Sequence, residues 1–362
     1  MSAARESAAR ETATVDGADI RHFGQLQDGR EVEVITLAAG ELRVRILTLG
    51  AILQDLRLAG VSWPLVLGSD LLAAYEGPMG WFGAVVGPVA NRLRGARAPL
   101  NGKELHFVVN NGAAVLHGGP VGTSGLIWTV EAAGPDHVRL RITLSDGTEG
   151  FPGNRTIRAE YRILPPDRLQ LRLSAETDAP TLMNLAHHPY WALDGARGTE
   201  TLTLQVAADH WLPVDEAILP SGEIRPVSGM RDLRQGRVMS DLPALDHNYC
   251  LMPGGPEAAR SRALTRAARL TGALGVSLEI ATTAPGLQIY DGAHVNTAPF
   301  PGLMGVPYGP GAGVALEAQL WPDAPHHADF PSISMAPEEK WEQVTEYRLT
   351  RVEAEGQTPR GR

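Results

Sequence analysis

The stretch Glu41-Leu42-Arg43-Val44-Arg45-Ile46-Leu47 alternates polar and apolar side chains, so that Leu42, Val44 and Ile46 share one face of a strand. The same period of two recurs along the chain, in segments 139–144, 169–173, 202–206 and 276–280. Gly, Pro, Asp or Asn residues lie close to most of their ends. Such alternation means one buried and one solvated face, which is typical of antiparallel sheets. The sequence therefore predicts many antiparallel strands joined by turns.

Helical signals are few. Segment 70–75 predicts one short helix with Asp70 near its N-cap, and segment 265–270 fits either a second helix or a strand. No series of alternating strands and helices occurs, which argues against a Rossmann or barrel-type α/β fold. No break in composition separates two domains. We therefore expect an all-β chain with few short helices, folded as a single antiparallel β-sandwich over residues 20–362.

Composition excludes several classes of protein. The 362 residues carry a net charge of -9 and no basic block, so a nucleic-acid partner is not expected. Cys250 is the only cysteine, which excludes an intrachain disulfide, and its apolar neighbours predict a buried thiol. The charged segment 1–19 has no signal-peptide core and is predicted to be a disordered tail. No run of about 18 apolar residues could cross a membrane, so we expect a cytoplasmic protein without a membrane partner.

Polar residues gather in four local clusters where strand patterns meet turns. These clusters are Gly87-Pro-Val-Ala-Asn-Arg-Leu93, Asn110-Asn-Gly112 with Leu116-His-Gly-Gly119, Asn184-Leu-Ala-His-His-Pro-Tyr-Trp191, and Val314-Ala-Leu-Glu-Ala-Gln319 with Trp321-Pro-Asp-Ala-Pro325. With them go two further pieces, Leu245-Asp-His-Asn-Tyr249 and Thr283-Ala-Pro-Gly-Leu-Gln-Ile-Tyr290. In content and order, the six pieces resemble the aldose 1-epimerase family, which includes galactose mutarotase. The resemblance runs from about Gly50 to Tyr347.

The resemblance implies a fold, a reaction and a set of site residues. The fold is a large antiparallel β-supersandwich of the galactose mutarotase type, with a sugar site in its concave face. The reaction needs no cofactor and no metal. Glu317 maps to the general base and His188 to the general acid. The residues expected to bind the sugar are Asn91, Arg92, His117, Asp246 and Gln288, and Tyr190 or Trp191 could offer a ring face to the sugar's C–H surface.

The chemistry of anomer exchange explains these residue types independently. The C1 hydroxyl must lose a proton while the ring oxygen gains one, after which the C1–O5 bond opens and recloses from either face. A carboxylate suits the first task and an imidazole the second. Arg92 and His117 could stabilise negative charge on an oxygen, and Asp246 can accept hydrogen bonds from hydroxyls. Two carboxylates, the usual arrangement of glycoside hydrolases, are not what the motifs present.

Plainer interpretations exist for several residues. Glu317 could be an outward-facing strand residue, although Val314-Ala-Leu316 leaves little alternation for that. His187 and His188 could form a surface pair or a metal site, but adjacent strand residues point to opposite faces, so one histidine is expected in the cleft and one behind it. The pair at 326–327 is predicted to lie in a solvated loop rather than at a metal.

The family pattern is not matched at every position. Many members have an arginine where Pro88 stands and an asparagine where His187 stands, which bears on the sugar preference more than on the reaction.

Interconversion of the anomers of a free aldohexose, galactose or glucose, is the function favoured by the motifs. A phosphosugar mutarotase is one alternative, for which Arg94 and Arg97 are the only nearby basic candidates. A sugar-binding protein without catalysis is another, but a pure binder has no need of an acid/base pair. The expected partner is a small sugar, and the expected state is a monomer or homodimer.

Overall fold

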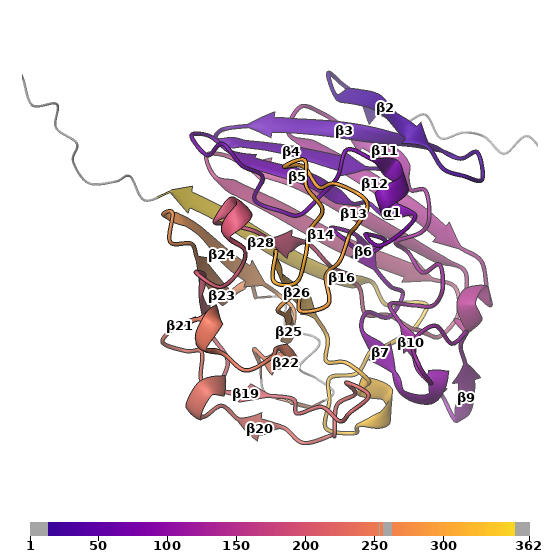
Figure 1. Cartoon of the computed structure of the whole chain (residues 1–362). Coiled ribbons are helices and arrows are strands. Elements are labelled where there is room, and N and C mark those ends of the chain that lie inside the picture. The colour runs from indigo at the N-terminus through magenta and orange to yellow at the C-terminus, as the bar shows by residue number, and fades with distance from the viewer. Residues whose placement is uncertain (1–13, 253, 256–262, 352–362) are drawn as a thin grey trace, which may run out of the picture.

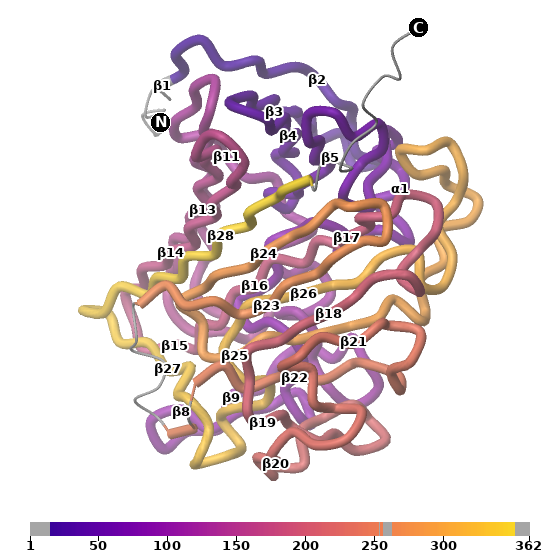
Figure 2. The backbone as a smooth tube through the Cα atoms, turned by 90° about the vertical axis from the view of Figure 1, so that its left-hand side faces the viewer, coloured from indigo at the N-terminus to yellow at the C-terminus, as the bar shows by residue number. Residues whose placement is uncertain are grey.

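The computed structural model describes residues 14–252, 254–255 and 263–351. Its largest element is a ten-stranded sheet in which every neighbouring pair is antiparallel except β1 and β11. In spatial order its strands are β1 (Thr14–Val15), β11 (Thr129–Ala133), β12 (His137–Leu144), β13 (Arg155–Leu164), β14 (Arg168–Thr177), β28 (Trp341–Arg351), β24 (Val276–Thr282), β23 (Thr265–Thr271), β18 (Thr203–Val206) and β21 (Arg237–Val238). Figure 2 shows β13, β14, β28, β24 and β23 crossing the molecule in this order.

Two further sheets are antiparallel throughout. The six-stranded sheet runs β17 (Tyr190–Trp191), β26 (Val314–Gln319), β25 (Gly286–Tyr290), β22 (Asp246–Cys250), β19 (His210–Trp211) and β20 (Arg225–Pro226). The four-stranded sheet runs β2 (Asp19–Gln25), β3 (Glu31–Ala39), β4 (Leu42–Leu47) and β5 (Leu53–Leu58). In Figure 1 the four-stranded sheet occupies the top of the molecule, and β22, β25 and β26 lie below it.

The remaining elements are short. Four two-stranded ladders pair β6 (Val85–Val86) with β16 (Ala186–His187), β7 (Arg92–Leu93) with β10 (Val115–Leu116), β8 (Arg97–Leu100) with β9 (Lys103–His106), and β15 (Thr181–Leu182) with β27 (Ser334–Met335). The α-helix α1 spans Leu72–Tyr75, and short 3₁₀ turns occur at η1 (Arg94–Ala96), η2 (Thr148–Gly150), η3 (Gly195–Arg197), η4 (Gly229–Arg231), η5 (Met239–Asp241) and η7 (Ala324–His326). The predicted all-β antiparallel architecture is confirmed.

The main apolar core fills the space between the ten-stranded and six-stranded sheets. Alternate residues of the long strands point into it, so that every second position of β13 and β14 is buried and the positions between them are half-buried or exposed. The six-stranded sheet contributes its own inward face, and both sets belong to one buried cluster that includes Leu171, Leu278, Leu287, Ile289, Leu316 and Leu349. Period-two alternation on both sheets thus produces the packed layer.

Three predictions about local structure can be compared with the observed elements. The predicted helix is shorter than segment 70–75: Leu71 is its N-cap and provides no side-chain cap, while the Asp70 carboxylate instead accepts a hydrogen bond from Arg45 Nη1 at 2.8 Å. Asp70 thus lies next to the N-cap, as predicted, but its side chain does not cap the helix. Segment 265–270 is part of strand β23. Residues 1–13 of the predicted tail lie outside the described residues, whereas Thr14 and Val15 pair with β11.

Cys250 is buried, as its neighbours predicted. Across the parts of the chain that the structure describes, no helix is long and apolar enough to cross a bilayer.

Candidate active site

The outer face of the six-stranded sheet carries a row of polar side chains. Gln288 on β25 lies directly opposite Asn248 on β22 and Glu317 on β26. Directly opposed residues of an antiparallel pair point to the same side of the sheet, as does Asp246, two residues before Asn248. The other side of these strands faces the apolar core, so both sides of β26 are buried. We call the row formed by Asp246, Asn248, Gln288 and Glu317 the polar floor. Glu317 therefore lies in this polar floor and not on the solvated side of a strand.

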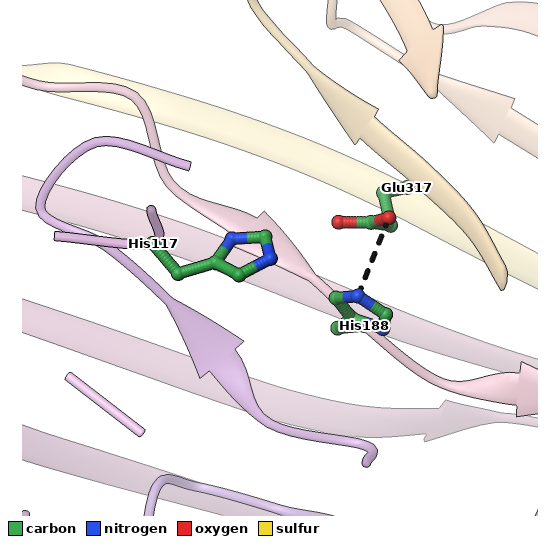
Figure 3. A group of neighbouring side chains, drawn as sticks. All are labelled: His117, His188 and Glu317. Carbon is green, nitrogen blue, oxygen red and sulfur yellow. Dashed lines mark ion pairs between the residues drawn. The ribbon is translucent and has the colours of Figure 1, made fainter. Parts of the chain in front are cut away.

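The acidic and basic centre of this floor is the pair formed by Glu317 and His188. Glu317 Oε1 lies 3.5 Å from His188 Nε2, and the two side chains are 3% and 5% exposed (Figure 3). Glu317 Oε2 and His188 Nδ1 have no hydrogen-bond partner among the described residues. Burial raises the pKa of Glu317 well above its ordinary value, and the charge of Asp246 raises it further, against the opposing effect of Arg92. Burial lowers the pKa of His188 to about 4.

His188 is held in place by its backbone. Its N–H donates to the carbonyl of Ala84 at 2.9 Å, and its carbonyl accepts from the N–H of Gly83, also at 2.9 Å. His187, the last residue of β16, points the other way and places Nδ1 3.0 Å from the Tyr347 hydroxyl. The structure thus separates the two histidines as adjacent strand positions predict, with one toward Glu317 and one in the core.

His117 completes a group of three side chains around the same space. Its ring centroid lies 5.4 Å from that of His188, and Figure 3 shows the His117 ring to one side of the Glu317–His188 pair. His117 Nδ1 accepts the backbone N–H of Asn91 at 3.2 Å, so the ring's proton sits on Nε2. Burial, followed by the charges of His188 and Arg92, lowers the pKa of His117 well below its ordinary value. His117 is therefore a neutral hydrogen-bond donor.

The turn after His117 requires glycine. Gly118 has a φ of 86°, and a Cβ on it would lie 2.0 Å from the carbonyl oxygen of Gly87. No side chain could occupy that space. The close approach of these two loops brings His117 against the segment that carries Asn91.

Arg92 is oriented by a residue that the motifs did not assign. Its Nε donates to Asn111 Oδ1 at 3.0 Å, and its Nη1 lies 3.9 Å from Asp246 Oδ2. Asn91, with a φ of 59°, turns its side chain back so that Oδ1 accepts the N–H of Arg92 at 2.8 Å. Asn111 belongs to a quoted cluster, but a side chain that anchors another across 19 residues leaves no periodic signal in the sequence.

Asp246 and Gln288 are joined directly, because Gln288 Nε2 donates to Asp246 Oδ1 at 2.5 Å. Burial raises the pKa of Asp246, although the Arg92 charge and this hydrogen bond oppose the effect. Together with Asn91 and Asn248, these two residues line one small hollow. Asn248 was not predicted. Both polar atoms of its side chain are buried without a partner among the described residues, which makes it a further candidate contact.

Aromatic rings line the same region. The Tyr190 ring lies 5.0 Å from that of His188 and packs on Phe82 at 4.3 Å. Trp191 is fully buried and packs against Tyr347 in the core, so it offers no face to a sugar. Trp81, which the motifs did not point to, is 39% exposed with its ring 5.1 Å from that of His117. An exposed ring at the edge of the polar floor suits the C–H surface of a sugar.

His117, His188 and Glu317 could also hold a divalent cation. Each offers one ligand atom, and these atoms lie within 4.8 Å of one another. Two imidazoles and a carboxylate are a donor set that suits zinc and similar ions. The anomer exchange expected from the motifs has no step that needs such an ion.

The second histidine pair is not in a solvated loop, and that prediction is wrong. His326 and His327 are 22% and 15% exposed and lie 2.6 and 3.6 Å from the two oxygens of buried Asp323. Burial alone would raise the pKa of Asp323, but the hydrogen bonds from the His326 ring and the Arg94 N–H, together with the nearby His327 ring, lower it to about 2. The pair therefore braces a loop next to β26.

Comparison with known proteins agrees with this geometry. The family model described as aldose 1-epimerase matches residues 33–348. Galactose mutarotase from Bos taurus is 33% identical over 342 residues, covering 91% of this chain and 97% of that protein. Aldose 1-epimerase from Escherichia coli is 30% identical, with coverage of 89% and 96%. The crystal structure of galactose 1-epimerase from Lactobacillus acidophilus superposes with a TM-score of 0.80 at 26% identity, covering 93% of this chain and 99% of that one. The chain belongs to the aldose 1-epimerase family.

Proposed function

We propose that Glu317 and His188 interconvert the α and β anomers of a free aldohexose, with Glu317 as general base and His188 as general acid. Membership of the family makes the chain a mutarotase, an isomerase. The observation that carries the assignment of roles is the 3.5 Å between Glu317 Oε1 and His188 Nε2. The C1 hydroxyl and the ring oxygen are bonded to the same carbon, so the groups that exchange protons with them must be close neighbours.

The burial of Glu317 and His188 indicates how many protons the two side chains hold together. A carboxyl with a raised pKa and a neutral imidazole with a lowered pKa together hold one proton. The same single proton on the imidazole gives a carboxylate and an imidazolium, which is the form that opens the ring. The carboxylate takes the C1 hydroxyl proton, and the imidazolium gives its proton to the ring oxygen as the C1–O5 bond breaks. Reclosure reverses both transfers, and the pair again holds one proton.

The surrounding residues would hold the sugar. Arg92 and the Nε2–H of His117 are donors directed at a space that could take a partly negative oxygen. The carboxylate of Asp246 and the amide oxygens of Gln288 and Asn91 are acceptors for hydroxyls. Tyr190, packed beside His188, would limit the position of the ring.

The alternative of a phosphosugar substrate has no support from the two arginines on which it depended. Arg94 is engaged through three nitrogens, with Asp215 at 3.0 Å, Asp323 at 3.4 Å and the Pro220 carbonyl at 3.0 Å. The Arg97 side chain is 57% exposed and lies 3.9 Å from Glu104. Neither presents a free guanidinium to the polar floor. A binding protein without catalysis is equally disfavoured, because the buried pair is costly to maintain without a use.

Galactose is the first sugar to test, because relatives bear its name. The decisive experiment compares His188→Asn with His187→Asn, a matched pair at adjacent buried positions. Polarimetry of freshly dissolved α-galactose and α-glucose should find His188→Asn slowed by about 10²-fold or more. His187→Asn should stay within a few-fold of wild type, because the His187 ring packs against Tyr161 and Tyr347 in the core and points away from Glu317. Equal loss in both variants would contradict the assignment of His188.

The cytoplasmic location, the monomer or homodimer, and the treatment of residues 20–362 as one domain stay predictions from the sequence.

A further inference from the structure

The outer face of the four-stranded sheet carries a hollow rich in arginine. The cavity has a volume of about 360 Å³ and is lined by Asp19, Arg21, Val34, Thr36, Arg43, Arg45, Asp55 and Arg57. The alternate residues of the same strands, such as Ile35, Val44 and Leu56, pack into the main core. Strands β2, β4 and β5 thus present apolar groups inward and charged groups to this hollow, while β3 contributes Val34 and Thr36.

Two of these arginines face each other. Arg43 on β4 is paired directly opposite Arg57 on β5. Like charges in directly opposed positions of an antiparallel pair destabilise the sheet. Among the described residues, Arg43 has neither a hydrogen bond nor an ion pair. Asp55 offsets the charge of Arg57, so Arg43 is the arginine of this pair that has no acidic partner among the described residues.

The other arginines are held so that donors remain free. Asp19 accepts from Arg21 Nε at 2.7 Å, and both oxygens of Asp55 accept from Arg57 Nε at 2.8 Å. The terminal nitrogens of Arg21 and Arg57 have no partner in the described chain. Arg45 uses one terminal nitrogen on Asp70, at 2.8 Å. Four guanidiniums therefore meet three carboxylates, and one positive charge is in excess.

A guanidinium fixed through Nε presents its two terminal N–H₂ groups as a fork, which matches the oxygens of a tetrahedral oxyanion. We propose that this hollow, named here the arginine hollow, binds the phosphate group of a small phosphorylated molecule between Arg43 and Arg57, with Arg21 at its rim. The bound anion offsets the repulsion across β4 and β5. The volume is that of a small-molecule site.

The arginine hollow is separate from the active site. It lies on the face of β2–β5 turned away from the core, whereas Glu317 is on β26 of the six-stranded sheet, with His188 beside it. Figure 1 shows the four-stranded sheet at the top of the molecule and β26 below it. Occupation of the hollow therefore leaves the sugar site open, and its test does not depend on the proposed function.

The test is titration calorimetry of the full chain with inorganic phosphate, pyrophosphate and hexose 6-phosphate at constant ionic strength in chloride. Wild type should bind phosphate, and Arg43→Gln should bind it at least about tenfold more weakly, because a charge-assisted hydrogen bond is lost. Arg197→Gln is the matched control: Arg197 is exposed, has no hydrogen bond or ion pair among the described residues, and lies in η3, outside the four-stranded sheet. That variant should bind as wild type does.

Thermal unfolding distinguishes a binding role of Arg43 from a purely structural one. If Arg43 only stabilised the fold, its replacement would lower the unfolding temperature. Without phosphate, Arg43→Gln should unfold at the same temperature as wild type or higher, because a like-charge pair has been removed. Phosphate should raise the unfolding temperature of wild type and of Arg197→Gln, but not of Arg43→Gln. Equal binding by wild type and Arg43→Gln, equal loss in both variants, or no phosphate binding by wild type would overturn the proposal.

Discussion

Replacement of Glu317 by glutamine should cost activity and increase stability at the same time. Glutamine keeps the shape of the side chain and can still bond to a sugar hydroxyl, but it cannot take a proton. General base catalysis contributes roughly 10²–10⁴-fold, so turnover should fall by that factor, about 3–5 kcal/mol of barrier. Because the other sugar contacts remain, the effect should appear in kcat much more than in KM.

The gain in stability follows from the burial of the carboxyl. Glu317 is 2% exposed, and its Oε2 has no partner among the described residues. Its pKa in the folded protein is raised above the ordinary 4.5, so the folded state holds a proton that the unfolded state releases. Stability therefore decreases as the pH rises from 4.5 toward the raised pKa, and the full penalty is present above it. Glutamine removes a penalty of about 1–3 kcal/mol, the usual cost of an unsatisfied buried group.

The assay pairs polarimetry with urea unfolding at several pH values. The free energy of unfolding of Glu317→Gln should exceed that of wild type at about pH 8, and the two should converge near about pH 4. Wild-type rates of anomer exchange would refute the assignment of the base. A variant less stable than wild type at the higher pH would refute the reasoning from burial, whatever its activity.

Two further outcomes are expected from the same site. The pH profile of kcat/KM should be bell-shaped, because the pair is active only while it holds one proton. Its acid limb should fall near pH 4, where His188 takes up a second proton, and its alkaline limb well above 4.5, where Glu317 loses its proton; a profile that stays flat through pH 4 would contradict this. Asp246→Asn should raise KM by about tenfold to a hundredfold, because a charged acceptor for hydroxyls is lost. The same change should move the alkaline limb to lower pH, since the Asp246 charge raises the pKa of Glu317, and an unchanged KM would remove Asp246 from the sugar site.

The strands were predictable because burial on one face imposes a period of two. Segment 139–144 lies in β12 and segment 169–173 in β14, and both show the expected alternation of burial. Which strands pair was not predictable from such patterns. β28 pairs with β14, which lies more than 160 residues earlier in the sequence, and on its other side with β24, and only the packing of the finished core selects those partners.

The site was predictable where a motif carried it and not where a contact was made at a distance. Glu317, His188, His117, Asp246 and Gln288 gather as the resemblance implied. The anchor Asn111 and the exposed ring of Trp81 escaped because each acts through one partner far along the chain.

Two side-chain environments differ from those expected from the sequence. Asp70 bonds to an arginine rather than to a helix end. The histidines after Pro325 turn inward because a buried aspartate lies within reach of both rings.

The side chains of the polar floor are regularly spaced, because they stand on adjacent strands of one sheet. Asn248, Gln288 and Glu317 are successive points across three strands, about 4.8 Å apart in the direction of the interstrand hydrogen bonds. Backbone hydrogen bonds set this distance between strands, whichever side chains the strands carry. Under the proposed function, exchanging one amide alters which hydroxyl can be bound at that position and leaves the neighbouring positions in place. Relatives with different sugar preferences could therefore arise by exchange of single side chains, without any rearrangement of the sheet.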